Sequence, residues 1–303
     1  MSARRLAGRL FAVALVGAAC VFLGLTIARN ADALRQFDWR IDPLLLVGSL
    51  LAHLLVLAWG VVVWHRVLMH TTPEPVSLGA LQHIWFVSGI ARYIPGKIWQ
   101  FVAAAQLAGR AGLSGAAVLT SMAIQIGFTL LAALLVSAAT LPIPESWSLD
   151  RVVLLGLGTL GAVLLSHPLV LRAALGVLPR ALHREVVAWT GSWADGVVLL
   201  ALSIVSWLLY GAAFWLFVSA LIDTPATALL PLAGVNALSF LAGYIVFVAP
   251  AGLGAREGAM TVLLAPLVPT YVAAVVAILS RLWTVAAELA GAGLASLLAR
   301  SRD

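Results

Sequence analysis

Charged side chains are scarce in this chain. Only 10% of its 303 residues are Asp, Glu, Lys or Arg, whereas a soluble domain carries about 25%. Apolar side chains make up 63%, and the mean hydropathy is +1.07. This composition excludes a soluble globular protein and a disordered one. It predicts an all-α polytopic membrane protein.

Cysteine is also nearly absent. Cys20 is the single one, so the chain can form neither a disulfide framework nor a cluster of thiolates around a metal. No phosphate-binding loop of the GxxxxGK[ST] type occurs, and the apolar runs leave no stretch for a soluble catalytic domain. We therefore expect no cofactor, no metal site and no catalytic residues, with the function located inside the bilayer.

Lysine occurs once, at Lys97, and the other 17 of the 18 basic residues are arginines. The formal charge of +6 is dispersed among hydrophobic spans and forms no single polar face, which argues against a nucleic-acid partner. The basic residues are better explained by membrane topology.

Apolar runs predict about six full transmembrane helices plus two broken ones, which makes eight membrane-embedded segments. Glycine, proline and charge interrupt the two apolar stretches 81–110 and 231–267, which we interpret as re-entrant hairpins. Eight full spans is the competing count. The six full spans are expected near residues 10–27, 44–68, 115–139, 152–171, 197–221 and 270–297.

The arginine distribution predicts the orientation, because cytoplasmic ends of membrane spans are enriched in basic residues. With both termini in the cytoplasm, ten arginines lie inside and four outside. Residues 172–195 carry arginines and tryptophans and resemble an interfacial amphipathic helix, although an ordinary loop fits equally well.

A repeated pattern divides the single integral membrane domain, 1–303, into a first repeat at 1–140 and a second at 150–303. Pro95 precedes Gln125 by 30 positions, and Pro250 precedes Arg281 by 31. With the predicted spans, the two halves are inverted in the membrane. Inverted repeats with helices broken near the midplane are a recurring transporter architecture.

Six ionisable side chains fall within the predicted membrane segments, where each costs about 2.5 to 3.5 kcal/mol at a helix centre. They are Arg92, Lys97, Arg256, Glu257, Arg281 and Glu288. A compact ammonium at Lys97 and the guanidinium of Arg92, five residues earlier, could both face one anionic group such as a phosphate. Helix capping or contact with a lipid headgroup is the alternative for Arg92.

The second broken stretch allows similar interpretations. Arg256 and Glu257 follow a glycine-rich turn whose helix N-terminal amides could face an anion, or they could pair with each other. Arg281 and Glu288 are seven residues apart on one helix face, and we expect them to pair. Glu257 and Glu288 are also possible proton carriers.

Uncharged polar residues accompany these segments. Gln100, Gln125 and Asn236 could bind a polar headgroup or serve helix packing. His53 is expected to pack or to bond a neighbour, and Tyr93 to mark the membrane interface.

Two stretches make the chain recognisable: Arg92-Tyr93-Ile94-Pro95-Gly96-Lys97-Ile98-Trp99-Gln100 and Pro250-Ala251-Gly252-Leu253-Gly254-Ala255-Arg256-Glu257. They resemble the signature stretches of the transmembrane, flippase-like domain family of lysylphosphatidylglycerol synthases, with Ala251 where a second glycine is expected. The resemblance implies a standalone member, without the synthase domain, that translocates a phospholipid or a lipid-linked headgroup. It also implies site roles for Arg92, Lys97, Arg256 and Glu257.

The leading hypothesis is a lipid flippase of the bacterial inner membrane, whose cargo is an anionic phospholipid or a polyprenyl-phosphate-linked glycolipid. A membrane-embedded transferase using a polyprenyl-phosphate donor is the alternative, with Asp38 and Asp42 as its catalytic pair; balancing by Arg35 and Arg40 is the simpler explanation of those carboxylates. A lipid-binding accessory subunit without transport is a third hypothesis. Other copies of the chain, or a cell-envelope biosynthesis protein, are possible partners.

Overall fold

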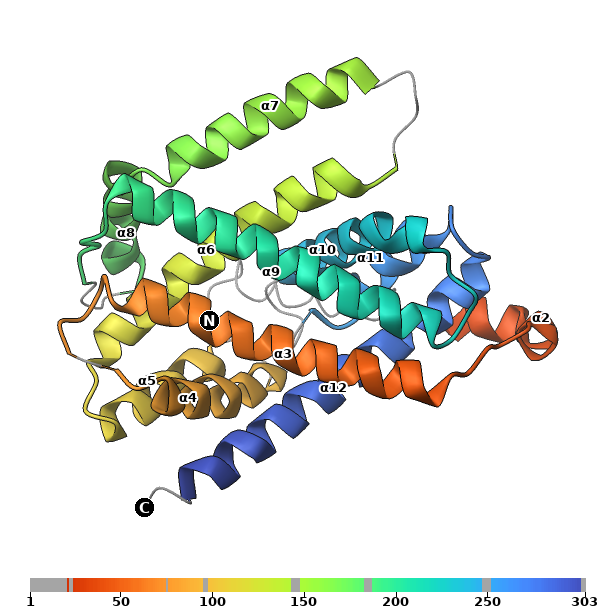
Figure 1. Cartoon of the computed structure of the whole chain (residues 1–303), viewed down its shortest axis with the longest axis horizontal. Coiled ribbons are helices and arrows are strands. Elements are labelled where there is room, and N and C mark those ends of the chain that lie inside the picture. The colour runs from red at the N-terminus through yellow and green to blue at the C-terminus, as the bar shows by residue number, and fades with distance from the viewer. Residues whose placement is uncertain are drawn as a thin grey trace, which may run out of the picture.

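The computed structural model describes residues 21, 24–74, 76–94, 98–142, 148–182, 187–246 and 252–300. Every regular element in these ranges is a helix, so the predicted all-α class is confirmed. The helices are α2 (Ala31–Gln36), α3 (Pro43–Leu68), α4 (Leu78–Ile90), η1 (Ala91–Tyr93), α5 (Trp99–Arg110), α6 (Gly115–Thr140), α7 (Ser148–Leu165), α8 (Pro168–Leu182), α9 (Trp193–Ser219), η3 (Ala226–Ala228), α10 (Leu229–Ile245), α11 (Ala255–Leu264) and α12 (Thr270–Arg300) (Figure 1).

Within the described ranges, five helical segments are long and apolar enough to cross a membrane: Pro43–Leu68, Gly115–Thr140, Trp193–Ser219, Ala226–Ile245 and Thr270–Ala299. Four of them match predicted spans. The segment Ala226–Ile245 contains the first helix of the predicted second hairpin. This helix is therefore long enough to cross the membrane without the second helix of the hairpin. The predicted first span, 10–27, lies largely outside the described residues.

The predicted span 152–171 is not one continuous helix. Helices α7 and α8 meet at a bend of 70°. Pro168 starts α8, where its missing N–H costs no hydrogen bond, and Nδ1 of His167 accepts a hydrogen bond from the Leu169 N–H at 3.2 Å. Of the predicted interfacial segment 172–195, the first part belongs to α8, at one end of the bundle, and the last residues begin α9 (Figure 1).

The two halves of the chain contain the same order of helices. A long helix, two short ones and a second long helix form α3 to α6, and the same order recurs in α9 to α12. Helix α3 packs on α9, α6 on α10 and α4 on α12. In this order, α3 corresponds to α9, α4 to α10 and α6 to α12. The α6–α10 contact therefore corresponds to the α12–α4 contact, and the α3–α9 contact corresponds to itself. Two-fold-related halves would give this pattern, and their inversion across the membrane stays a prediction.

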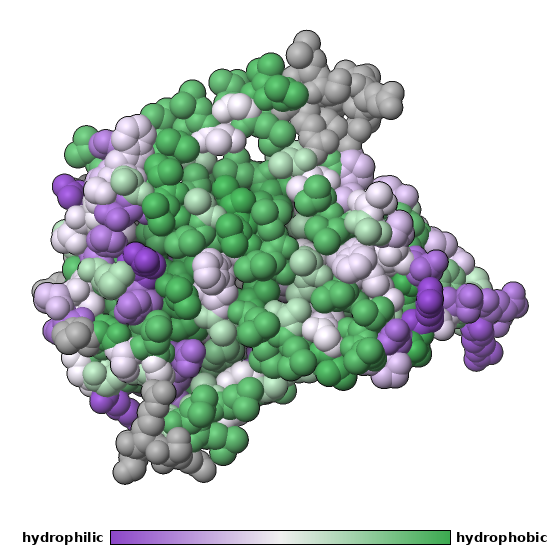
Figure 2. Space-filling model, in the orientation of Figure 1, coloured by the Kyte–Doolittle hydropathy of each residue, from purple (hydrophilic) through white to green (hydrophobic). Residues whose placement is uncertain are grey.

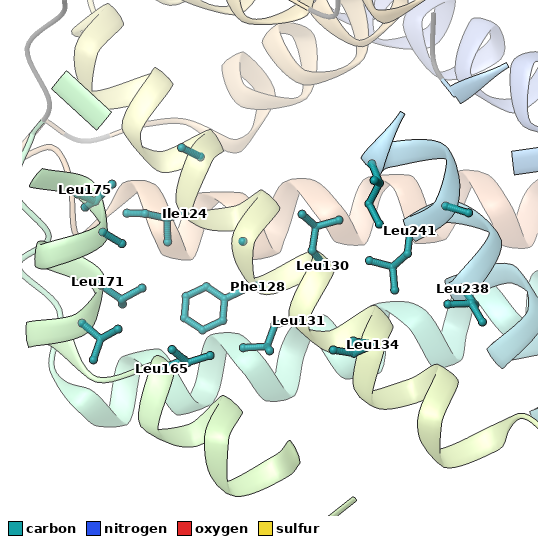
Figure 3. Close-up of a pocket in the computed structure, with 16 residues that line it drawn as sticks. Ile124, Phe128, Leu130, Leu131, Leu134, Leu165, Leu171, Leu175, Leu238 and Leu241 are labelled. Carbon is teal, nitrogen blue, oxygen red and sulfur yellow. The ribbon is translucent and has the colours of Figure 1, made fainter. Parts of the chain in front are cut away.

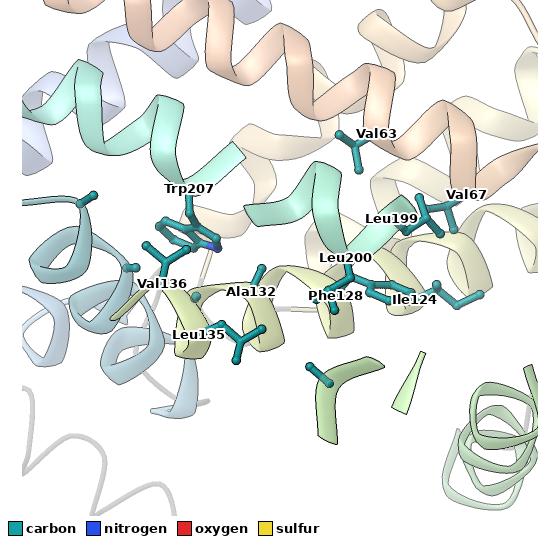
Figure 4. Packing of buried hydrophobic residues seen from close by; sticks show 14 of the residues in the cluster. Val63, Val67, Ile124, Phe128, Ala132, Leu135, Val136, Leu199, Leu200 and Trp207 are labelled. Atoms are coloured by element: carbon teal, nitrogen blue, oxygen red, sulfur yellow. The ribbon is translucent and has the colours of Figure 1, made fainter. Parts of the chain in front are cut away.

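Small residues let the central helices approach closely. A Cβ on Gly211 of α9 would lie only 2.2 Å from the Cβ of Ala233 on α10. Beside this contact, Trp207 donates an indole hydrogen bond to the Thr129 carbonyl of α6 at 2.9 Å. Figure 4 shows the buried core that results, where Phe128 of α6 meets Leu200 of α9.

The outer surface of the bundle is apolar. On α3, Leu44 is 82% exposed and Leu55 is 72% exposed. Figure 2 shows a broad hydrophobic band with hydrophilic residues gathered at both ends of the helices. Such a surface is stable only in contact with lipid, so the chain is a polytopic membrane protein.

Candidate functional site

The first helix break follows α4, where the 3-10 turn η1 leads out of the helix. Arg92 folds back at this point, and its Nε donates a hydrogen bond to the Gly89 carbonyl at 2.9 Å. A Cβ on Gly89 would lie 3.2 Å from Nη2 of Arg92, so glycine makes room for the guanidinium. Residues 95–97 lie outside the described residues, and with them the prediction for Lys97.

The second break lies between α10 and α11. Gly252 and Gly254 have φ angles of +74° and +82°, a region that favours glycine. A Cβ on Gly252 would lie 2.7 Å from the Cα of Gly243, and one on Gly243 would lie 2.9 Å from the Cβ of Arg256. The glycines therefore let the chain return onto the end of α10 and place Arg256 against it.

The Glu257 carboxylate lies at the N-terminal amides of α11, where the sequence suggested that an external anion could bind. Its carboxylate accepts a hydrogen bond from the Gly254 N–H at 2.6 Å and so caps the start of α11. Its other oxygen lies 3.6 Å from Nη1 of Arg281. The suggested pairing of Arg256 with Glu257 is not the arrangement found, because Arg256 instead places Nη2 3.5 Å from the Asn236 amide oxygen.

Helix α12 connects the two breaks. Glu288 accepts from Nη1 of Arg92 at 3.0 Å and from the Tyr93 hydroxyl at 2.8 Å. The Arg281 guanidinium lies over the Tyr93 ring, 5.4 Å from its centroid, and faces Glu257. The expected pair between Arg281 and Glu288 is therefore wrong: Glu288 pairs with Arg92 and Arg281 faces Glu257, although both side chains contact Tyr93.

Five side chains make up what we call the ion cluster: Arg92, Arg256, Arg281, Glu257 and Glu288. Three guanidinium groups against two carboxylates leave one formal positive charge. Arg256 is 7% exposed, Glu257 6% and Glu288 8%, whereas the Arg92 side chain is 29% exposed, so water does little to compensate the charge around Arg256. Nε of Arg256 and the amide nitrogen of Asn236 have no hydrogen-bond partner among the described residues.

An anion with several oxygens suits this arrangement chemically. Guanidinium groups bind phosphate oxygens in a bidentate geometry, and the unpartnered nitrogens are donors. The space beside Arg92 and Glu288 is nevertheless only about 10 Å³, which holds at most one water. In this conformation, the two carboxylates take the places that ligand oxygens would fill.

The other predicted polar residues differ in their relation to the cluster. Asn236 lies beside the cluster and contacts Arg256 through its amide oxygen. Gln125 on α6 donates from Nε2 to the Gly60 carbonyl of α3 at 3.0 Å, which is a packing contact. Gln100 is half-buried in the first turn of α5, just past the first break.

Two tyrosines belong to the site in ways that sequence reasoning missed. Tyr93 was expected to mark the membrane interface, but it binds Glu288. Tyr210 on α9 interacts with the guanidinium of Arg256. In the sequence repeat, Tyr210-Gly211 of the second half corresponds to Trp59-Gly60 of the first half. This correspondence was the one sequence feature that pointed to Tyr210.

Comparison with known proteins decides the family. The lysylphosphatidylglycerol synthase TM region matches residues 7–291. The chain belongs to this family. The match includes both helix breaks and the whole ion cluster, so the resemblance seen in the two signature stretches is confirmed.

A curated relative of the chain is the inner membrane protein YbhN of Escherichia coli (strain K12). It is 27% identical over 172 residues. The alignment covers 53% of the chain and 50% of YbhN, so the chain spans about half the length of this relative.

Proposed function

We propose that the chain moves an anionic lipid between the leaflets of the bacterial inner membrane and holds the headgroup phosphate at the ion cluster. One observation carries the proposal: α12 contacts both helix breaks, because its Glu288 binds Arg92 at the first break and its Arg281 faces Glu257, the neighbour of Arg256, at the second. The cargo classes are an anionic phospholipid and a polyprenyl-phosphate-linked glycolipid, because both bring a phosphate into the membrane.

Burial gives the arginines their selectivity for anions. An excess positive charge in a low-dielectric interior attracts an anion more strongly than an exposed arginine does. Broken helices add backbone polar groups that hydrocarbon cannot satisfy, and such breaks persist where protein, water or ligand covers them. An incoming phosphate would compensate the excess positive charge and accept hydrogen bonds from backbone N–H groups at the breaks.

The carboxylates of Glu257 and Glu288 already pair with arginines, so a phosphate would bind by replacing them. Because the space beside Arg92 is too small for a headgroup, a phosphate that binds Arg92 would displace Glu288, and one that binds Arg281 would displace Glu257. A proton on either glutamate would weaken its pairing and release the arginine. Glu257 and Glu288 are therefore the proton carriers in this proposal, and proton binding would favour loading of the lipid.

Reconstitution tests the proposal. The purified protein is placed in phosphatidylcholine vesicles containing fluorescent phosphatidylglycerol or a labelled polyprenyl phosphate, and transfer between leaflets is followed with a membrane-impermeant quencher. For Arg92→Gln with Arg256→Gln, we expect transfer to slow at least about tenfold, which corresponds to about 1.4 kcal/mol in the barrier.

Arg110→Gln is the matched control, because Arg110 is an exposed arginine in the last turn of α5, outside the cluster. It should transfer lipid at the wild-type rate. Equal rates for the wild type and the double variant would contradict the proposal. Lipid binding without transfer in the wild type would instead favour the accessory-subunit alternative.

Asp42, one of the two residues that motivated the transferase alternative, has a structural role. Asp42 caps α3 by accepting hydrogen bonds from the N–H groups of Leu44 and Leu45, at 2.9 and 3.1 Å. The arginines expected to balance it bind other acids: Arg35 lies 3.8 Å from Asp32, and Arg40 3.2 Å from Asp223. Transport remains the better proposal for the site.

A further inference from the structure

A second space, among the described residues, is large, open and lined by apolar side chains. It has a volume of about 730 Å³, within the range of about 300 to 1,000 Å³ that is usual for ligand pockets. It lies between α6, the bent α7–α8 pair and α10, and Figure 3 shows Phe128, Leu131, Leu171 and Leu241 around it. We call this space the apolar groove.

Among the described residues that line the apolar groove, none has a side chain that can form a hydrogen bond. A headgroup would lose its hydration there without compensation, so the groove suits hydrocarbon alone. Gly127 opens the floor of the groove, because a Cβ at this position would meet nothing within 4 Å.

The groove adjoins the ion cluster through the end of α10. Ala242 and Ile245 line the groove, whereas Gly243 between them backs onto the Cβ of Arg256. Tyr244 interacts electrostatically with Arg92. One turn of α10 therefore presents hydrocarbon to one side and the arginines to the other, which matches the two ends of an amphiphile.

The length of the groove indicates which hydrocarbon fits. Its lining on α6 extends from Ala123 to Leu134, eleven steps of 1.5 Å or about 16 Å. One leaflet of the hydrocarbon core is about 15 Å deep. A phospholipid acyl chain has this reach, whereas a long polyprenyl chain extends beyond one leaflet.

We propose that the apolar groove binds one acyl chain of an anionic phospholipid whose phosphate enters the ion cluster. The inference rests on the proposed function and specifies its cargo as a phospholipid. The groove guides the tail along α6 and α10 while the headgroup exchanges with the glutamates.

Photo-crosslinking in vesicles tests the inference. The probe is phosphatidylglycerol with a diazirine in one acyl chain, in phosphatidylcholine vesicles containing the full-length protein. Phosphatidylcholine and a polyprenyl phosphate with the same diazirine are the comparison probes. We expect phosphatidylglycerol to label peptides that contain Gly127 and Leu241 several-fold more than either comparison probe.

Gly127→Phe fills the groove without changing any charge. Both the labelling and the transfer of phosphatidylglycerol should fall about tenfold, a loss of about 1.4 kcal/mol. Gly293→Phe is the matched control, because Gly293 is an exposed glycine of α12 whose Cβ also meets nothing within 4 Å. Ala123→Phe, which fills the same groove from another turn of α6, replaces Gly127→Phe if that variant does not fold.

The outcomes separate this inference from the proposed function. Equal labelling by phosphatidylglycerol and phosphatidylcholine would mean that the groove holds bulk lipid, and preferred labelling by the polyprenyl probe would mean a different tail; either overturns the inference. Wild-type transfer and labelling in Gly127→Phe would also overturn it. If Gly127→Phe blocks transfer but the Arg92→Gln, Arg256→Gln variant does not, the result supports acyl-chain binding in the apolar groove and contradicts phosphate binding at the ion cluster.

Discussion

The guanidinium of Arg92 lies 3.0 Å from the carboxylate of Glu288, although 196 positions separate the two residues. This contact holds the first helix break against α12. One turn further along α12, a Cβ on Gly291 would lie only 2.3 Å from the Phe86 ring of α4. Close packing of the two helices thus sets the distance at which arginine and glutamate meet.

Removal of the Glu288 carboxylate should destabilise the protein. Glu288→Ala leaves the Arg92 guanidinium and the Tyr93 hydroxyl without this acceptor, so we expect the free energy of unfolding to fall by about 1.5 to 3 kcal/mol. Unfolding by sodium dodecyl sulfate in mixed micelles measures the change. Glu288→Gln keeps an acceptor and should lose clearly less; identical losses in the two variants would speak against the hydrogen bonds.

Gly252 should not tolerate a side chain. Its φ of +74° costs other residues about 1 to 3 kcal/mol, and its Cβ would lie 2.7 Å from the Cα of Gly243. We expect Gly252→Ala to lower the unfolding free energy by at least that amount. Gly127→Ala is the control, because open space in α6 should make it neutral or stabilising by about 0.5 to 1 kcal/mol.

The sequence located both helix breaks because glycine, proline and charge are conspicuous in an apolar chain. It could not assign the ionic partners. Seven residues separate Arg281 from Glu288, which places them on one helix face but about 10 Å apart along the axis. The structure instead pairs Arg281 with Glu257 and Glu288 with Arg92. These partners come from other elements, whose approach depends on packing that sequence spacing does not reveal.

The sequence also did not predict the bend between α7 and α8, because the bend depends on tertiary packing as well. Residues 152–171 are predominantly apolar despite Ser166, His167 and Pro168, so hydropathy alone predicts one span. Pro168 is compatible with a kinked helix or with a new helix start, and the Leu169 N–H bond to His167 favours the second. Gly196 adds a tertiary cause, since a Cβ there would lie 2.3 Å from the Ser166 carbonyl oxygen.

His53 should be replaceable by phenylalanine. Its ring packs between those of Tyr210 and Trp283, with centroids 4.6 and 4.2 Å away, and its nitrogens have no hydrogen-bond partner among the described residues. An unpartnered buried polar atom costs about 1 to 3 kcal/mol, so His53→Phe should keep or raise the unfolding free energy. A loss of more than about 2 kcal/mol would instead indicate a polar role.

Asp42 should act as a helix cap and not as a catalyst. Asp42→Ala removes the acceptor for the first amides of α3 and should cost about 1 kcal/mol of stability, whereas Asp42→Asn should cost little. Mass spectrometry of lipids from cells that express each variant checks the chemistry. A covalent lipid product that disappears in Asp42→Asn would restore the transferase alternative.

The membrane orientation can be tested with single cysteines, since Cys20→Ser removes the native one. Arg40 and Asp223 lie 3.2 Å apart at one end of the bundle, the end predicted to face outward. Asp223→Cys should therefore react with an impermeant maleimide added to intact cells. Arg110→Cys, predicted to face the cytoplasm, should react only after the membrane is opened; the reverse pattern would place both termini outside.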